Sequence, residues 1–346
     1  MPTKTIGDLP PLIVGGAVFN TQYNSDPHSL SSTEILEVAF AKGFNAIDTS
    51  PYYGPSEEIL GEALKKIKGK WARETYMICT KAGRVKLNDF DYSREAVRKS
   101  VLRSLQRLDT TYLDLVYMHD IEFVNEQEIF EALRELKLLK EEGLVLNIGV
   151  SGYPVDFLYK IALECKQGDI GSLDMIMSYS NGCIQNELMF QYYDDFLTKC
   201  GVKKIMNGSI LSMSLLRSEP TKDFHPAPRA LKDRVTQVAT TLKREDGVEL
   251  ADLATRFALR RSLFESKTAK KGEEKKQENG ALVWDETCSI VLGVSNVAEL
   301  EDAISNFELV RSNGPINRED DILFKKVREE LGEHFNETWE SGIKHN

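Results

Sequence analysis

The chain has 346 residues, of which 41% are hydrophobic, and its net charge is −10 with a pI of about 5.2. A chain of this length and apolar content can bury a large core, as one large domain or as two smaller ones. The acidic balance gives no global basic field for nucleic acid or an anionic membrane, and no stretch approaches the roughly 20 apolar residues of a membrane span. We therefore expect a soluble globular protein with neither of these partners.

The cysteines and the first residues bear on the cellular compartment. Five cysteines are scattered along the chain without any Cys-x-x-Cys pair, which predicts free thiols in a reducing compartment. Residues 1–8 lack the apolar core of a signal peptide. We expect a cytoplasmic protein. The cysteines are Cys79, Cys165, Cys183, Cys200 and Cys288.

Short apolar and β-branched segments alternate along the chain with segments of helical spacing. Several of the short segments are apolar at consecutive residues, which is typical of strands buried on both faces of a parallel sheet. The predicted strands are Leu12–Gly15, Phe44–Asp48, Tyr76–Lys81, Leu113–His119, Val145–Val150, Asp174–Ser178, Lys203–Asn207 and Ser289–Gly293.

The helical segments between these strands carry boundary signals of their own. Ser31 and Glu34 form a capping-box pattern at the start of the first segment, and Gly43 stands where a C-cap glycine would end it. Apolar residues recur at intervals of three and four after Ser93 and again before Gly143. Eight uninterrupted strand–helix alternations predict an α/β fold, a closed (β/α)₈ TIM barrel.

A doubly wound open sheet is the alternative architecture, but no Gly-x-Gly-x-x-Gly motif follows the first strand. We predict a single domain over residues 1–346 with two additions to the barrel. The segment 262–285 contains a run of mixed charge without an apolar face, and we expect a mobile insertion there, before the last strand. Arg318–Leu331 is expected to form an extra C-terminal helix, followed by a polar tail.

Four polar residues fall at or just after the ends of consecutive predicted strands. Asp48 ends the second strand, Tyr53 lies in the loop after it, Lys81 ends the third strand and His119 ends the fourth. The carboxyl ends of the strands form the functional face of such barrels. Each residue alone has a structural explanation, as a loop cap, a packing residue, a surface lysine or a rim histidine. Together they favour an active site, because a lysine beside a barrel core needs a counter-charge and Asp48 can supply it.

These residue types suit proton transfer at one oxygen atom. Free tyrosine has a pKa of about 10, and a neighbouring ammonium would lower it toward neutrality. We expect Asp48 to hold Lys81 charged, and His119 to donate a hydrogen bond to the reacting oxygen. The set has no metal-ligand spacing, so we predict no metal. A nicotinamide cofactor would then have to transfer the hydride.

The order and context of these four residues resemble the catalytic tetrad of the aldo-keto reductase family. The strings Asn45–Gly54 and Tyr112–Asp120 carry the resemblance, which covers nearly the whole chain apart from the charged insertion. It implies that Tyr53 is the proton-transferring residue and that the other three assist it.

Three further segments, Ile210–Ser218, Phe224–Pro226 and Glu333–Glu337, resemble a sugar-oxidising subgroup of this family. The resemblance implies oxidation of an aldose at C1 to the aldonolactone, with D-arabinose, L-galactose or L-fucose as the substrate and D-erythroascorbate synthesis as the pathway. Candidates for lining the sugar pocket are Phe19, Tyr52 and Asp120.

The same resemblance assigns a cofactor site to the loops after the last four strands. Gly152 replaces the asparagine of a common Ser-Asn pair, and Gly208 replaces an aromatic residue that commonly stacks on the nicotinamide. NADPH-preferring relatives typically place an arginine where this chain has Glu299, whose carboxylate would repel a 2′-phosphate and accept hydrogen bonds from a free ribose hydroxyl. We therefore predict NAD; the alternative is that Glu299 only stabilises a helix N-terminus. The predicted cofactor-binding residues are Ser151, Ser178, Ser209, Leu211, Gly293, Val294, Ser295, Glu299 and Asp302.

Other functions stay open at this point. A general NADPH-dependent aldehyde reductase lacks support because the arginine is missing. A lysine-based aldolase would need Lys81 deprotonated and free of Asp48. A non-catalytic, cofactor-sensing subunit should expose a large apolar docking face. The oligomeric state is not predicted.

Overall fold

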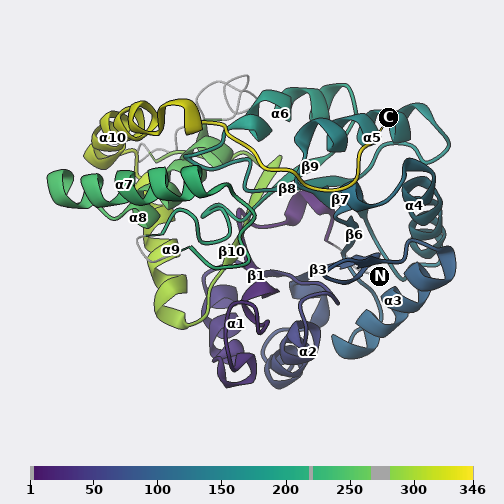
Figure 1. Cartoon of the computed structure of the whole chain (residues 1–346). Helices are drawn as coiled ribbons and strands as arrows, with labels where there is room; N and C mark the ends of the chain where they lie inside the picture. The colour runs from purple at the N-terminus through teal and green to yellow at the C-terminus, as the bar shows by residue number, and fades with distance from the viewer. Residues whose placement is uncertain (1–3, 218–220, 266–280, 346) are drawn as a thin grey trace.

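Eight parallel strands close into a barrel in the computed structural model, which describes residues 4–217, 221–265 and 281–345. Around the barrel the strands follow the order β1-β10-β9-β8-β7-β6-β3-β2, and helices surround them (Figure 1). The predicted (β/α)₈ barrel is confirmed. Its strands are β1 (Leu12–Gly15), β2 (Ala46–Asp48), β3 (Met77–Ala82), β6 (Leu115–His119), β7 (Ile148–Gly152), β8 (Met175–Tyr179), β9 (Lys204–Gly208) and β10 (Cys288–Gly293).

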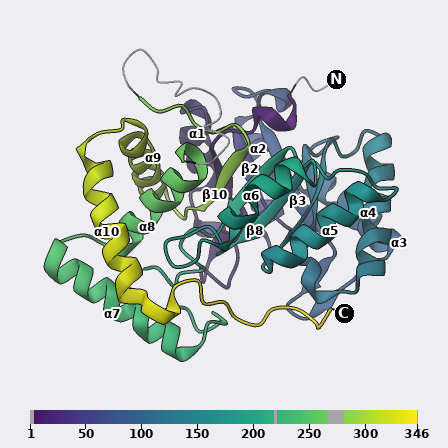
Figure 2. The same cartoon turned by 90° about the horizontal axis from the view of Figure 1, so that it is seen from above.

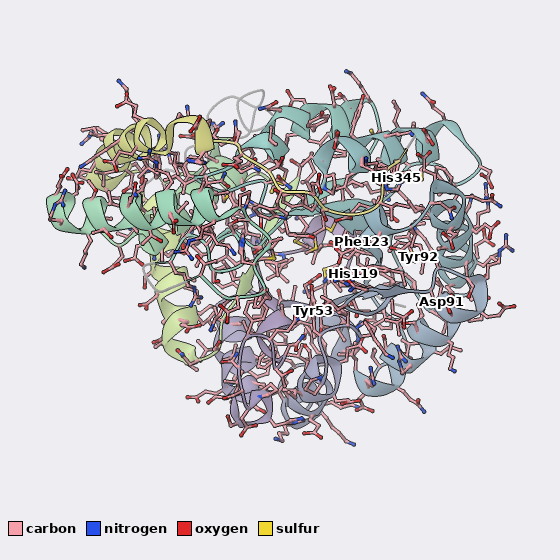
Figure 3. The ribbon with its side chains drawn as sticks, viewed as in Figure 1. Tyr53, Asp91, Tyr92, His119, Phe123 and His345 are labelled. Atoms are coloured by element: carbon pink, nitrogen blue, oxygen red, sulfur yellow. The ribbon has the colours of Figure 1, made fainter. Side chains whose placement is uncertain are left out.

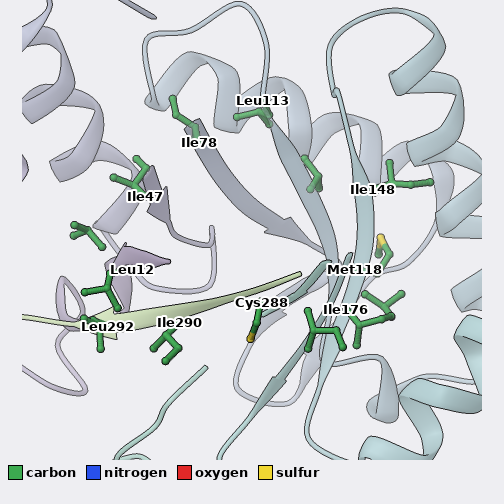
Figure 4. Close-up of a cluster of buried hydrophobic side chains, with 14 of the residues drawn as sticks. Leu12, Ile47, Ile78, Leu113, Met118, Ile148, Ile176, Cys288, Ile290 and Leu292 are labelled. Carbon is green, nitrogen blue, oxygen red and sulfur yellow. The ribbon is translucent and has the colours of Figure 1, made fainter. Parts of the chain in front are cut away.

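The strands are apolar on both faces because both faces are buried. One face fills the barrel interior with side chains such as Ile13, Met77 and Met206, and Ile6 and Leu9 cover the interior at its amino-terminal end. The other face packs against the surrounding helices (Figure 4). Residues of this outer layer include Leu12, Ile47, Ile78, Leu113, Ile148, Ile176 and Ile290.

The helices follow the strands in the order that the sequence predicts. The first begins one residue after Ser31, but the Ser31 side chain makes no capping hydrogen bond, so the predicted capping box is wrong. Gly43 does adopt the left-handed backbone conformation that ends a helix, with φ of 85°. The barrel helices are α1 (Ser32–Ala41), α2 (Ser56–Ile67), α3 (Arg94–Arg107), α4 (Glu126–Glu141), α5 (Val155–Gln167), α6 (Leu188–Thr198), α8 (Leu250–Leu259) and α9 (Val297–Arg311).

Three additions extend the barrel. A small antiparallel hairpin of β4 (Arg84–Lys86) and β5 (Asp89–Phe90) follows β3 directly. Helix α7 (Arg229–Asp246) precedes α8, and α10 (Pro315–Leu331) follows α9 as the predicted extra helix. Figure 2 shows α7 and α10 side by side at one flank of the molecule.

The structure describes only the two ends of the predicted insertion. The expected insertion spans 262–285, and residues 266–280 lie outside the described residues. At its start, however, Ser262 and Leu263 are fully buried in a π-helical turn, Arg260–Phe264. At its end, the Asp285 amide donates a hydrogen bond of 2.6 Å to the Leu263 carbonyl. Both ends therefore belong to the packed barrel, because Leu263 lies in the hydrophobic core and Leu282 and Trp284 pack against it.

The C-terminal segment is not a free polar tail. After α10, residues 335–345 run across the end of the barrel toward α5 (Figures 1 and 2). Trp339 stacks on Tyr153 with ring centres 4.4 Å apart, and His345 stacks on Phe157 at 3.9 Å. This segment therefore forms part of the rim at the carboxyl ends of the strands.

All five cysteines are free and buried. Within 4–217, 221–265 and 281–345, no helix is long and apolar enough to cross a bilayer.

Candidate active site

A cavity of about 1430 Å³ opens at the carboxyl ends of the barrel strands. The four predicted catalytic residues all line it, and Figure 3 shows Tyr53 and His119 close together at the barrel opening. Asp48 ends β2, Lys81 lies near the end of β3, and His119 ends β6. Because β2, β3 and β6 are adjacent in the barrel, residues distant in sequence meet at one point.

Asp48 and Lys81 form a buried ion pair. The Lys81 Nζ donates a hydrogen bond of 2.5 Å to Asp48 Oδ1 and another of 2.9 Å to the Thr49 carbonyl. Burial, the largest single influence, would lower the pKa of Lys81, but the charge of Asp48, the hydrogen bond to Asp48 and the nearby Tyr53 together outweigh it, and the net shift is upward. Lys81 is therefore a fixed cation, as the sequence predicts, and it is not the free amine that a Schiff-base aldolase requires.

Tyr53 lies beside this cation. The Lys81 Nζ is 5.0 Å from the centre of the Tyr53 ring. Burial raises the pKa of Tyr53 above its ordinary value, while the positive charge of Lys81 acts in the opposite direction. The prediction that the net pKa falls is therefore wrong for this structure, although Lys81 contributes with the predicted sign. Tyr53 is a neutral phenol here, and Lys81 limits the cost of ionising it.

His119 completes the group as a neutral imidazole. Burial lowers its pKa well below the ordinary value, and the positive charges of Lys81 and Arg84 act in the same direction. Its Nδ1 lies 3.0 Å from the Ser50 Oγ, and its ring is perpendicular to that of Tyr53 with centres 5.7 Å apart. A neutral histidine at this place can share a hydrogen bond with a substrate oxygen without carrying charge into the site.

Most of the predicted cofactor residues line the same cavity. They are Ser151, Ser209, Leu211, Gly293, Val294, Ser295, Glu299 and Asp302. Ser178 does not: its hydroxyl donates to the Tyr153 carbonyl at 3.3 Å behind the wall, and its neighbours Met177 and Tyr179 face the cavity. Side chains alternate along a strand, so a one-residue error in register moves a residue to the other face.

Glu299 has a structural partner in addition to its place in the cavity wall. Its Oε2 accepts a hydrogen bond of 2.8 Å from the Ser295 amide, and its own amide donates to Asn296 Oδ1 at 2.9 Å. These bonds cap the start of α9. Glu299 therefore does stabilise the helix N-terminus, as the alternative interpretation expects. The two roles are compatible, because a carboxylate has two oxygens and several lone pairs.

Glu122 explains why glycine stands at position 152. A Cβ on Gly152 would lie 2.5 Å from Glu122 Oε2, so the larger side chain has no room. Glu122 is buried, and its Oε1 accepts hydrogen bonds of 3.0 Å from the Tyr153 amide and from the Ser341 hydroxyl. Glycine at position 152 therefore makes room for the Glu122 carboxyl group, which binds the C-terminal segment through Ser341.

Several residues of the cavity were not predicted from the sequence. Arg84 lines it from the β4–β5 hairpin, and Trp339 and Ser341 line it from the C-terminal segment. The signal for Arg84 is its place one residue after Gly83, directly beyond a predicted catalytic strand. No pattern in the polar C-terminal sequence indicates that it returns to the site. Conversely, Phe19 is fully buried and is not among the lining residues, so its prediction as a pocket residue is wrong.

The residues present fit a nicotinamide dinucleotide. The cavity continues from Tyr53 to Ser295 and Asn296 at the start of α9, and a helix N-terminus favours the negative charge of a diphosphate. Gly208 also lines the cavity, where a Cβ would make ordinary van der Waals contacts, the nearest at 3.5 Å. The described residues contain no group of three or more histidine, cysteine or acidic side chains placed to hold a metal ion.

The chain belongs to the aldo/keto reductase family, whose model matches residues 11–323. It is thus a member of a family of oxidoreductase enzymes. Among its relatives, D-arabinose 1-dehydrogenase of Saccharomyces cerevisiae is 44% identical over 98% of this chain and 96% of its own length. L-galactose dehydrogenase of Arabidopsis thaliana is 31% identical over 96% of this chain and 92% of its own.

Solved structures show the same fold at lower identity. An aldo-keto reductase from Bacillus halodurans in its holo form superposes with a TM-score of 0.61 at 20% identity, covering 92% of this chain and 91% of the other. At this sequence identity, the likeness shows the barrel fold alone.

Proposed function

We propose that this protein oxidises an aldose at C1 to the aldonolactone with NAD⁺ as the hydride acceptor. The observation that carries the proposal is the Asp48–Lys81 ion pair beside the Tyr53 phenol, with neutral His119 at the same cavity wall. D-Arabinose is the first candidate substrate and L-galactose and L-fucose are the next, following the named activities of the two relatives and the resemblance of the sequence. The product would serve D-erythroascorbate synthesis, and the cytoplasm is the proposed location.

Each residue has a defined part in this reaction. His119 and Tyr53 hold the C1 hydroxyl. Tyr53 first releases its own phenolic proton to solvent through the cavity, and the resulting phenolate accepts the hydroxyl proton as the C1–H bond breaks. Lys81 stabilises the negative charge on the Tyr53 oxygen before that proton arrives, and Asp48 keeps Lys81 charged and in place. The bound nicotinamide supplies the acceptor for the hydride that leaves C1. Proton and hydride together account for the two hydrogens that an aldose loses on forming its lactone.

Acidic residues at one wall of the cavity support NAD over NADP. Glu299 and Asp302 come from α9, and Asp252 comes from the first turn of the adjacent α8. Glu249, just before α8, also lines the cavity but is paired with Lys243 at 2.7 Å. Carboxylates in this number would repel the 2′-phosphate of NADP, whereas they are acceptors for the hydroxyl groups of an unphosphorylated ribose.

The direct test is to supply a panel of pentoses and hexoses with NAD⁺ and NADP⁺ in parallel. Formation of reduced nicotinamide is followed by absorbance and the lactone by NMR. We expect lactone with NAD⁺ and at least one of D-arabinose, L-galactose and L-fucose. Oxidation with NADP⁺ alone would contradict the cofactor assignment, and reduction of simple aldehydes without any aldose oxidation would contradict the substrate assignment.

A further inference from the structure

Arg84 is a cation that the fold holds at the edge of the cavity and that the catalytic steps above do not use. It follows Gly83, whose backbone has φ of 99° and whose missing Cβ would lie 2.4 Å from the Tyr92 ring. Only glycine fits this turn without displacing the buried tyrosine. The turn directs the β4–β5 hairpin over the end of the barrel, and it brings Arg84 into the cavity wall.

The Arg84 side chain is fixed from several sides and is only 13% exposed. Its Nη1 donates to Asp120 Oδ2, and its Nη2 donates to the Leu87 carbonyl at 2.9 Å. The guanidinium carbon lies 4.0 Å from the centre of the Tyr52 ring, so the planar group is stacked against an aromatic face. A side chain held in this way loses little further entropy when it binds a ligand.

Donor groups remain on this fixed guanidinium. Arginine has five N–H groups, of which the hydrogen bonds above use two. The Nε is buried and has no hydrogen-bond partner among the described residues. Besides the Nε N–H, the second N–H on each Nη nitrogen is not used by these hydrogen bonds. Arg84 lines the cavity, so these donors belong to its wall. Asp120, which also lines it, lies 3.6 Å from the catalytic His119 Nε2, so Arg84 is linked through Asp120 to the reacting end of the cavity.

We propose that Arg84 is a specificity-determining residue that binds the hydroxyl groups of the sugar beyond C1. The inference rests on the proposed function and deepens it. A guanidinium that keeps N–H groups on both Nη nitrogens can donate to two neighbouring hydroxyl oxygens of a vicinal diol. The Asp120 carboxylate neutralises the charge of Arg84, which favours a neutral, polyhydroxylated ligand over a carboxylate or phosphate. An unhydroxylated aldehyde would leave these donors without partners and would bind less well.

The test compares two substrates that differ only in hydroxyl groups. D-Glyceraldehyde and propanal have the same carbon chain, and both are reduced, in the reverse direction, at the aldehyde carbon. We expect Arg84→Gln to lower the ratio of kcat/KM for glyceraldehyde to that for propanal by about 10- to 100-fold, the effect of one or two charge-assisted hydrogen bonds. The change should appear mainly in KM. Arg84→Lys, which keeps the charge, should recover part of the ratio.

Lys86→Gln is the matched control, because Lys86 lies exposed on the same hairpin and does not line the cavity. It should leave the ratio unchanged. An unchanged ratio in Arg84→Gln, with a normal melting temperature, overturns the proposal. The proposal is also overturned if Arg84→Gln changes kcat/KM only for an anionic aldehyde such as glyoxylate.

The comparison does not depend on aldose oxidation. If the wild-type enzyme oxidises no aldose, the proposed function fails, while the glyceraldehyde-to-propanal ratio still decides the role of Arg84. For a protein that turns over neither aldehyde, saturation-transfer NMR of sugar binding to the wild type, Arg84→Gln and Lys86→Gln decides it. Weaker binding in Arg84→Gln alone supports the proposal, and equal binding in all three overturns it.

Discussion

Lys81 is a buried cation whose charge is balanced by one carboxylate, Asp48. Removing the amine leaves that carboxylate buried without a partner, which typically costs about 3–5 kcal/mol. We therefore expect Lys81→Met to lose both stability and turnover. The melting temperature and kcat of the purified variant measure the two effects.

The double variant Asp48→Asn, Lys81→Met separates the two roles. It removes both charges together, so most of the lost stability should return while turnover stays low, because the stabilisation of the Tyr53 phenolate is still absent. Recovery of turnover in the double variant would show that the pair serves the fold alone.

Glu299 is the residue at which cofactor choice is most directly testable. Replacement by arginine exchanges a charge that repels a 2′-phosphate for one that pairs with it. We expect the preference for NADP over NAD to rise roughly tenfold or more, with a small loss of stability from the lost Ser295 hydrogen bond. Glu301→Arg, on the same helix but outside the cavity wall, is the control. Equal shifts in both variants would show that the effect is one of net charge.

Helices and strands were predictable from the sequence where the pattern that marks them lies within the element itself. Each predicted strand overlaps an observed one, because consecutive apolar residues mark a strand buried on both faces. The Ser31 capping box failed because the Ser31 backbone, with φ of −73° and ψ of 49°, is not in the extended conformation that an N-cap residue typically adopts. The path of residues 335–345 was missed for a different reason. Its contacts join residues far apart in the sequence, and Ile343 N, for example, donates at 2.9 Å to the carbonyl of Glu122, more than two hundred positions away.

Glu122 makes the attachment of this C-terminal segment dependent on pH. Burial raises the pKa of Glu122 from 4.5 to about 8, and the neighbouring Asp120 charge adds to the rise. A carboxyl with a raised folded-state pKa contributes stability that is present below the unfolded pKa and is lost as the pH rises through about 8. We expect the segment 335–345 to loosen between about pH 5 and pH 9, seen as faster amide exchange at Ile343.

Glu122→Gln is the matched variant for this prediction. Glutamine keeps an oxygen that can accept from the Tyr153 amide and the Ser341 hydroxyl, and it does not ionise. Protection of the Ile343 amide should then be nearly independent of pH, after correction for the intrinsic exchange rate. The same pH dependence in wild type and Glu122→Gln would contradict the role of this carboxyl.

The whole barrel determines which residues can act together. The order Asp48, Tyr53, Lys81, His119 was readable from the sequence because each follows a recognisable strand, and the closed topology brings those strand ends to one place. The net pKa of Tyr53 was not readable, since it depends on how deeply the loop lies in the folded molecule. Arg84 was missed because its position follows from a glycine turn over the barrel end.

The central claim is that Tyr53 transfers the proton while the rest of the site stays intact. The measurement is Tyr53→Phe, assayed for aldose oxidation and for NADH binding by fluorescence titration on the same preparation. The variant should lose turnover by about 10²–10⁴-fold, the usual contribution of a positioned acid–base group, and should bind NADH as the wild type does. A variant that binds NADH normally and oxidises the aldose at a near-normal rate would contradict the claim.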